Sequence, residues 1–145
     1  MLFRSPAAEE PEATYPLFLT TGRVLAQYQS GTQTRRVPEL TALAARPQAE
    51  LHPALARRHG IREGDTVRVT TRRGRATFEA RLTEAIREDT VFVPFHWGGE
   101  GKANALTNPA LDPTSRMPEF KVCAARLERA TAEIVSEGPA GEGRA

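Results

Sequence analysis

One predicted β-hairpin constrains the fold more than any other part of the chain. Residues 66–71 alternate between polar and apolar side chains, with Val67 and Val69 on one face. A turn at Arg72-Arg73-Gly74 follows, and residues 75–82 alternate again. Strict alternation over two neighbouring segments is typical of paired strands with one buried face. Any fold proposed for this chain must therefore accommodate an antiparallel pair at its centre.

A second segment, residues 90–95, is a continuous apolar run bounded by turn signals. That pattern suits a strand buried on both faces, as in a closed barrel. A short helix is predicted over residues 52–60, where Pro53 suits the first helical position and Gly60 the stop. Further strand candidates are residues 17–19, 49–51 and 122–127. Together these elements predict a small, mainly β barrel with helical insertions.

The two ends of the chain differ in composition from its middle. Residues 1–14 read as a disordered lead or linker and residues 129–145 as a flexible tail, which leaves one domain at residues 15–128. Hydrophobic residues make up 39%, so the core is modest or is completed by something else. No apolar run approaches the ~20 residues of a membrane span. The beginning of the chain lacks the pattern of a signal peptide, so we predict a cytoplasmic protein.

The loop that follows the first strand candidate has an unusual polar composition. Residues 20–36 supply hydroxyls, amides, two glycines and three arginines, without a carboxylate. Glycine lets backbone N–H groups approach a phosphate, and arginine forms charge-assisted bonds with its oxygens. A nucleotide pyrophosphate is the ligand that this composition suits, and a polar surface loop is the alternative. A net charge of +2 gives little support to a nucleic-acid partner.

No self-contained catalytic set can be recognised in the sequence. Cys123 lies alone in an apolar stretch, which is typical of an inert buried thiol. His96 has no second metal ligand at a useful spacing, which favours a hydrogen-bonded histidine. The P-loop, the glycine-rich dinucleotide motif and the Gly-x-Ser-x-Gly elbow are all missing. We therefore predict a binding module with no catalytic residue and no metal site.

Short motifs spread along residues 15–128 form one recognisable series. They are Thr21-Gly22-Arg23, Thr34-Arg35-Arg36-Val37-Pro38-Glu39-Leu40, His52-Pro53, Gly64-Asp65, Phe92-Val93-Pro94-Phe95-His96-Trp97-Gly98, Asn104-Ala105-Leu106-Thr107 and Pro118-Glu119-Phe120-Lys121-Val122-Cys123-Ala124. In this order they resemble the molybdopterin-dinucleotide-binding domain that closes the large subunit of molybdenum oxidoreductases of the nitrate reductase and formate dehydrogenase group. The resemblance implies a six-stranded double-psi β-barrel. It also implies a cofactor, the Mo-bis(molybdopterin guanine dinucleotide).

The same resemblance implies which residues contact that cofactor. One dinucleotide would lie along a loop made of Thr21, Gly22, Arg23, Val24, Leu25, Ala26, Gln27, Tyr28, Gln29 and Ser30. Asn104 and Lys121 would add further contacts, and Phe95 would line the substrate funnel. Relatives often have Trp-His where this chain has Tyr28-Gln29, and glutamine does not titrate near neutral pH, which argues against a proton role there. Arg35 and Arg36 fall outside the matched contact positions.

The resemblance finally implies what the chain needs from elsewhere. The iron–sulfur cysteines and the molybdenum ligand of the family lie in earlier domains, so we expect no turnover from this chain alone. Its partners would be the catalytic domains of a molybdenum oxidoreductase, in the same polypeptide or in a separate subunit. An assimilatory nitrate reductase is the whole enzyme that we favour, and a formate dehydrogenase is the alternative within the family. A cofactor-free double-psi barrel adaptor is the alternative outside it.

Overall fold

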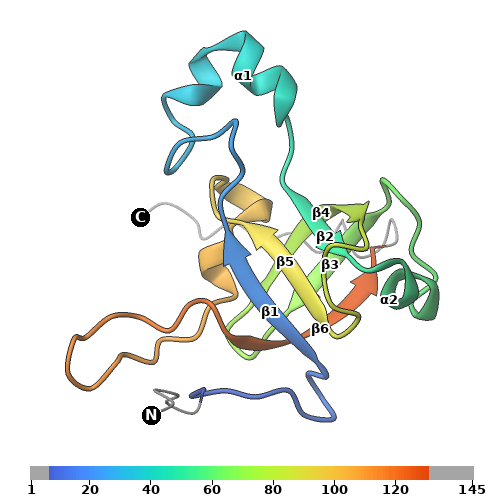
Figure 1. Ribbon diagram of the computed structural model, residues 1–145, viewed down its shortest axis with the longest axis vertical. Helices are drawn as coiled ribbons and strands as arrows, with labels where there is room; N and C mark the ends of the chain where they lie inside the picture. The colour runs from blue at the N-terminus through green and yellow to red at the C-terminus, as the bar shows by residue number, and fades with distance from the viewer. Residues whose placement is uncertain (1–6, 131–145) are drawn as a thin grey trace, which may run out of the picture.

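Six strands form the centre of the molecule in the computed structural model, which describes residues 7–130 (Figure 1). The strands are β1 (Leu17–Gly22), β2 (Gln48–Leu51), β3 (Thr66–Thr70), β4 (Arg75–Leu82), β5 (Thr90–Pro94) and β6 (Cys123–Arg129). They close into a barrel in the order β1-β5-β2-β4-β3-β6. Strand β1 runs parallel to β5 and β2 runs parallel to β4, whereas the other neighbouring pairs are antiparallel. The predicted six-stranded double-psi β-barrel is thereby confirmed.

The hairpin predicted from alternation is the antiparallel pair β3–β4. Its register sets Val67 opposite Phe78 and Val69 opposite Ala76, and all four side chains are buried. The prediction that β5 is buried on both faces is wrong for one of them. Val91 and Val93 are fully buried, but Phe92 is only half-buried because it lies on the outer face of the barrel.

Two short α-helices lie outside the ring of strands. Helix α2 (Pro53–Arg58) begins after His52, whose Nδ1 accepts a hydrogen bond from the backbone N–H of Ala54 at 3.1 Å. The helix ends before Gly60, which has a φ of +63° that glycine adopts without strain. Helix α1 (Pro38–Leu43) likewise begins at a proline. No helix among residues 7–130 has the length and apolar character needed to cross a membrane.

Strand β6 extends further than its hydrophobic pattern predicts. The apolar pattern ends at Leu127, but the strand continues to Arg129. The reason is that β6 pairs with β3 over this stretch, with Arg129 opposite Val67. The Arg129 guanidinium also lies 3.0 Å from the carboxylate of Asp65.

Two long connections leave the barrel (Figure 1). The insertion, residues 23–47, carries the 3₁₀ helix η1 (Thr34–Arg36) and helix α1 and stands away from the barrel beyond the end of β1. The arm, residues 108–120, loops out on another side and is held by an isolated bridge between Leu111 and Pro118. The 3₁₀ helices η2 (Gly99–Gly101) and η3 (Ala103–Ala105) lie between β5 and the arm.

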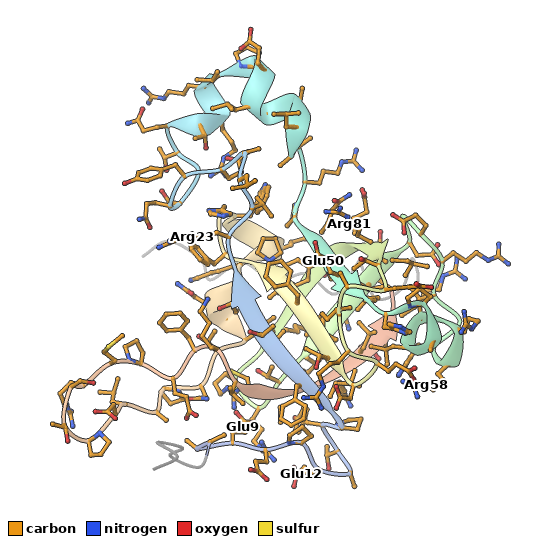
Figure 2. The ribbon with its side chains drawn as sticks, viewed as in Figure 1. Glu9, Glu12, Arg23, Glu50, Arg58 and Arg81 are labelled. Carbon is orange, nitrogen blue, oxygen red and sulfur yellow. The ribbon has the colours of Figure 1, made fainter. Side chains whose placement is uncertain are left out.

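The segment before β1 lies against the β3–β4 turn (Figure 2). The Glu9 carboxylate pairs with both Arg72 and Arg73, and Glu12 pairs with Arg72. The Arg72 guanidinium also lies over the Tyr15 ring, 5.1 Å from its centroid. The disordered lead proposed for residues 1–14 stays a prediction, as does the flexible tail, most of which lies outside the described residues.

Candidate functional site

The candidate site begins where β1 ends. Gly22 is opposite Pro94 in the parallel β1–β5 pair, and its carbonyl oxygen accepts a hydrogen bond from the Phe95 N–H at 3.2 Å. A Cβ on Gly22 would collide with the Phe92 ring, so a larger residue here would require that ring to move. The parallel pairing brings residues 23–31 and residues 95–98 to the same end of the barrel.

His96 joins these two segments. Its side chain is fully buried. Its Nε2 accepts a hydrogen bond from the Val24 backbone N–H at 2.9 Å, and its Nδ1 lies 2.5 Å from the carbonyl oxygen of Gln29. A backbone N–H can only donate, so Nε2 carries no proton and Nδ1 donates to Gln29. The neutral ring therefore fixes both sides of the loop.

Arg35 supplies a second connection between the same segments. Its Nη1 donates to the carbonyl oxygen of His96 at 2.9 Å, and its Nη2 donates to the carbonyl oxygen of Ser30 at 2.8 Å. Gly31 allows this approach, because a Cβ there would lie 2.9 Å from Arg35 Cζ and 3.0 Å from the carbonyl oxygen of His96.

The Gln27 side chain forms a third connection of the loop. It is buried, and its Nε2 donates to the carbonyl oxygen of Ala44 at 3.1 Å. Its Oε1 accepts a hydrogen bond from the Thr34 hydroxyl at 2.5 Å. The Gln27 side chain therefore ties the loop to the rest of the insertion, and its polar atoms are already engaged within the protein.

The loop also leaves hydrogen-bond donors free. Within residues 7–130, the backbone N–H groups that make no hydrogen bond in this loop include those of Leu25, Ala26, Gln29 and Ser30. The Arg23 guanidinium is exposed, and it too has no bond to the described part of the protein. Gln29 has a φ of +47°, which turns the chain between the two anchored ends. Free N–H groups and a guanidinium in one loop form a donor set that suits phosphate oxygens.

Thr21 and Lys121, which the resemblance assigns to the cofactor, lie in contact with each other. Lys121 Nζ donates to the carbonyl oxygen of Thr21 at 2.5 Å. The Thr21 side chain is buried and its hydroxyl donates to the carbonyl oxygen of Phe120 at 3.3 Å. Lys121 is exposed and keeps two further N–H bonds available. The lysine can thus hold the end of β1 and still meet an anion.

The remaining two predicted residues lie beside this end of the barrel. The Phe95 ring is half-buried and its centroid lies 4.6 Å from that of His96. Asn104 lies in η3, where its side chain is exposed and forms no hydrogen bond with the described residues. Among the described residues, no hydrogen bond joins Asn104 to the loop at residues 21–30.

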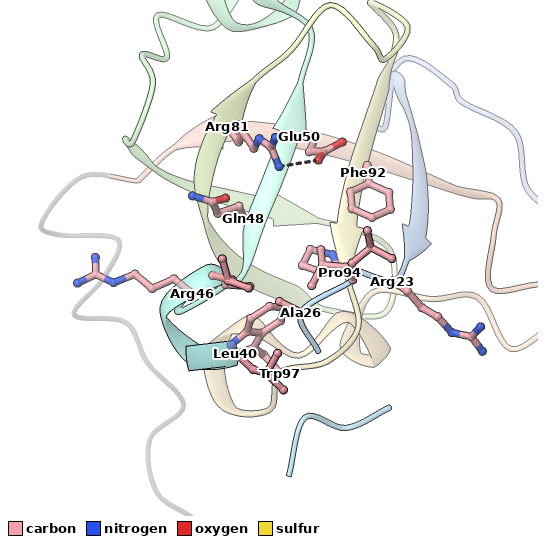
Figure 3. Close-up of a pocket in the computed structure, with 14 residues that line it drawn as sticks. Arg23, Ala26, Leu40, Arg46, Gln48, Glu50, Arg81, Phe92, Pro94 and Trp97 are labelled. Carbon is pink, nitrogen blue, oxygen red and sulfur yellow. Dashed lines mark hydrogen bonds and ion pairs between the residues drawn. The ribbon is translucent and has the colours of Figure 1, made fainter. Parts of the chain in front are cut away.

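A cavity of about 510 Å³ lies between the insertion and the outer face of β2, β4 and β5 (Figure 3). At its barrel side Glu50 and Arg81 point toward one another, with 3.3 Å between Oε1 and Nη1. Arg23 extends away from the other labelled side chains. The lining residues are Arg23, Val24, Leu25, Ala26, Leu40, Leu43, Ala44, Arg46, Gln48, Glu50, Arg81, Phe92, Pro94 and Trp97.

Cys123 takes no part in this site, and no metal-binding cluster is found among the described residues. The Cys123 side chain is buried in β6, and burial raises the pKa of its thiol. The Asn108 N–H donates to Cys123 Sγ at 3.3 Å. Across residues 7–130, histidine, cysteine, aspartate and glutamate side chains form no group of three that could hold a metal ion.

Sequence reasoning missed what His96 and Arg35 do in this site. A hydrogen-bonded histidine was predicted, but not its partners, since His96 is 72 residues from Val24. Arg35 was set aside, although it bonds both Ser30 and His96. No local spacing signals such contacts, because they exist only once the β1–β5 pair has formed.

Comparison with known proteins adds three findings. Residues 17–124 match the family model described as "Molydopterin dinucleotide binding domain". The chain is 45% identical over 119 residues to the assimilatory nitrate reductase catalytic subunit of Bacillus subtilis, a match that covers 82% of the chain and 17% of that protein. It is 46% identical over 122 residues to the F420-dependent formate dehydrogenase subunit alpha of Methanocaldococcus jannaschii, covering 84% of the chain and 18% of that protein.

A solved structure supports the fold independently. Acetylene hydratase from Pelobacter acetylenicus matches 81% of the chain with a TM-score of 0.70 at 23% identity, and the match covers 19% of that enzyme. The chain thus spans less than a fifth of the proteins that it resembles, with 17% and 18% of the two curated relatives covered. Most of the length of both relatives therefore lies outside the matching region.

Proposed function

Because this chain belongs to the Molydopterin dinucleotide binding domain family, we propose that its loop at residues 21–30 holds the guanine nucleotide end of a molybdopterin guanine dinucleotide. The observation that carries the proposal is the donor set of this loop. Leu25, Ala26, Gln29 and Ser30 have free backbone N–H groups, and the same loop carries the unpaired Arg23 guanidinium and no carboxylate.

The donor set fits a pyrophosphate better than a neutral ligand. Backbone N–H groups and a guanidinium all donate, so a ligand there must accept several hydrogen bonds and carry negative charge. Lys121 adds a further cation at the end of β1. Asn104 would have to be reached by another part of the same ligand.

In this role the chain positions a cofactor. Its backbone donors and Arg23 would bind the phosphates and so hold the cofactor in a fixed position against the rest of the enzyme. The molybdenum–pterin group supplies the redox chemistry when it is bound. The second dinucleotide, the iron–sulfur cluster and the metal ligand would belong to the catalytic domains that complete the enzyme, in the same polypeptide or in another subunit.

The whole enzyme that we favour is an assimilatory nitrate reductase of the cytoplasm. The similarity to the Bacillus subtilis subunit supports this choice. The formate dehydrogenase subunit from Methanocaldococcus jannaschii is similar to the same degree, so formate oxidation is the second candidate. Assay of the complete enzyme with nitrate and with formate separates the two, because only one substrate should turn over at an appreciable rate.

Isothermal titration calorimetry tests the binding role directly. The folded chain is titrated with GDP, with inorganic phosphate and with CDP. The proposal expects weak, saturable binding of GDP and weaker binding of both other ligands. Equal binding of GDP and phosphate would contradict a nucleotide site and favour the cofactor-free adaptor. In the complete enzyme, replacement of Arg23 and Lys121 should lower the content of bound molybdenum.

A further inference from the structure

We infer that His96 and Arg35 are positioning residues, which hold residues 23–31 in the ligand-binding conformation before any ligand arrives. His96 has no ring nitrogen left for a ligand, and Arg35 uses two of its five N–H bonds to join two carbonyl groups of the protein. The inference rests on the proposed function, since the ligand in question is the nucleotide end of the dinucleotide.

His96 fixes both sides of the loop with one rigid ring. Nε2 accepts from Val24 and Nδ1 donates to Gln29, so both nitrogens are used. The ring is 0% exposed and packs between the neighbouring Phe95 and Trp97 rings, with centroids 4.6 and 5.9 Å away. A histidine in this environment has no nitrogen left for a ligand, and its position at the end of β5 ties the loop to the barrel.

Arg35 holds the far side of the same loop through a bridge between two carbonyl groups. Its two terminal nitrogens reach Ser30 and His96, so the planar guanidinium fixes the distance between them. The fork passes close to Gly31, which has a φ of +72°. Lysine has one nitrogen at its tip and lacks this fork geometry.

The two anchors determine where the free donors point. Between Val24 and Gly31 the loop has two internal backbone hydrogen bonds, from Gln27 to Val24 and from Gly31 to Tyr28. Such a loop has few bonds of its own to hold a conformation. A loop that is already ordered loses less conformational entropy on binding, and binds more tightly for that reason. His96 would raise affinity in this way without touching the ligand, and Arg35 would do so through its bonds to Ser30 and His96.

Arg35→Gln and Arg36→Gln form a charge-matched pair that tests the inference. Arg36 is exposed and its side chain forms no hydrogen bond with residues 7–130. Exchange of the hydrogen-bonded amides of Val24, Gln27 and Gly31, measured without ligand, reports the order of the loop. We expect faster exchange and about tenfold weaker GDP binding for Arg35→Gln, and neither change for Arg36→Gln. Equal effects of the two variants would show that charge alone matters and would overturn the inference.

His96→Gln and His96→Leu provide the second comparison. A glutamine amide can accept from Val24 and donate to Gln29, whereas leucine can do neither. We expect His96→Gln to keep GDP binding within about threefold and His96→Leu to lose it. Wild-type affinity in a folded His96→Leu variant would contradict the positioning role. Should His96→Leu fail to fold, the comparison of Arg35→Gln with Arg36→Gln still tests the inference.

The two proposals can fail separately. Hydrogen exchange is measured without ligand, so it tests the anchoring of the loop on its own. A wild-type chain that does not bind GDP would remove the proposed function. Slow exchange in wild type and Arg36→Gln, with fast exchange in Arg35→Gln, would still establish the anchoring.

Discussion

Lys121 and Thr21, 100 residues apart in the chain, are joined by a 2.5 Å hydrogen bond from the lysine Nζ to the threonine carbonyl oxygen. The contact places a cation at the end of β1, directly before the loop whose N–H groups are free. It also connects the last strand to the first, since Lys121 lies just ahead of β6. Lys121 thus connects the first and last strands of the barrel and also supplies positive charge to the candidate site.

Lys121→Met should weaken GDP binding by about tenfold, because it removes a charge-assisted contact and frees the end of β1. Calorimetry at fixed ionic strength measures the change. Lys102→Met is the matched control, since Lys102 is an exposed lysine whose side chain has no bond to the described residues. A similar loss in both variants would mean that general charge, and not the position of Lys121, attracts the nucleotide.

Gly31→Ala should destabilise the protein by about 1–3 kcal/mol. Gly31 has a φ of +72°, and an added Cβ would meet both Arg35 and the carbonyl oxygen of His96. Urea denaturation measures the free energy of unfolding. Gly98→Ala serves as control, because Gly98 has a φ of −100° and open space around its Cα. An unchanged midpoint for Gly31→Ala would show that the loop rearranges at no cost.

Cys123 should be unreactive toward thiol reagents in the folded protein and reactive in denaturant. The Cys123 thiol is buried in β6, and burial raises its pKa. The folded state therefore favours the neutral thiol. The resulting stabilisation is full below the unfolded pKa of about 8.5 and is lost as the pH rises through the higher folded value. Ellman's reagent and urea unfolding between pH 7 and 10 measure both effects. Fast labelling under native conditions would contradict the burial of this side chain.

Glu9→Gln should loosen the segment before β1. The Glu9 carboxylate pairs with Arg72 and Arg73, and its side chain is 9% exposed, so loss of its charge leaves two guanidiniums with one partner fewer. We expect a cost of about 1 kcal/mol and faster amide exchange in residues 8–15. Glu10→Gln is the control, since Glu10 is exposed and has no ion pair within residues 7–130. Equal exchange rates in Glu9→Gln and Glu10→Gln would show that the ion pairs of Glu9 do not hold this segment.

The barrel was predictable from local patterns to a considerable extent. The β3–β4 hairpin follows from alternation, because each strand shows its buried face in its own residues. Strand β5 follows from its apolar run, and helix α2 from its proline and glycine ends. Each of these signals lies within one stretch of sequence, so it can be recognised without knowing which distant segments pair in the fold.

The closing contacts of the site were not predictable in the same way. The bonds from His96 to Val24 and Gln29, and from Lys121 to Thr21, join residues that are 67 to 100 positions apart. The resemblance identified the loop, but it did not separate side chains that face a ligand from side chains that hold the loop. Gln27 is an example of a residue that holds the loop, since its amide group is hydrogen-bonded to Thr34 and Ala44. Only the folded arrangement reveals such use.

The closed ring of strands has a consequence for how this domain meets other molecules. Each of the six strands has a neighbour on both sides, so the ring leaves no unpaired sheet edge. An incoming strand therefore finds no backbone ladder to extend, and the barrel itself cannot recruit a partner by adding a strand or grow into a fibril through edge pairing. Association must instead use side chains, either on the outer face of the barrel or on the segments that leave the ring. The barrel provides a rigid support, and the insertion and the arm add surface outside it.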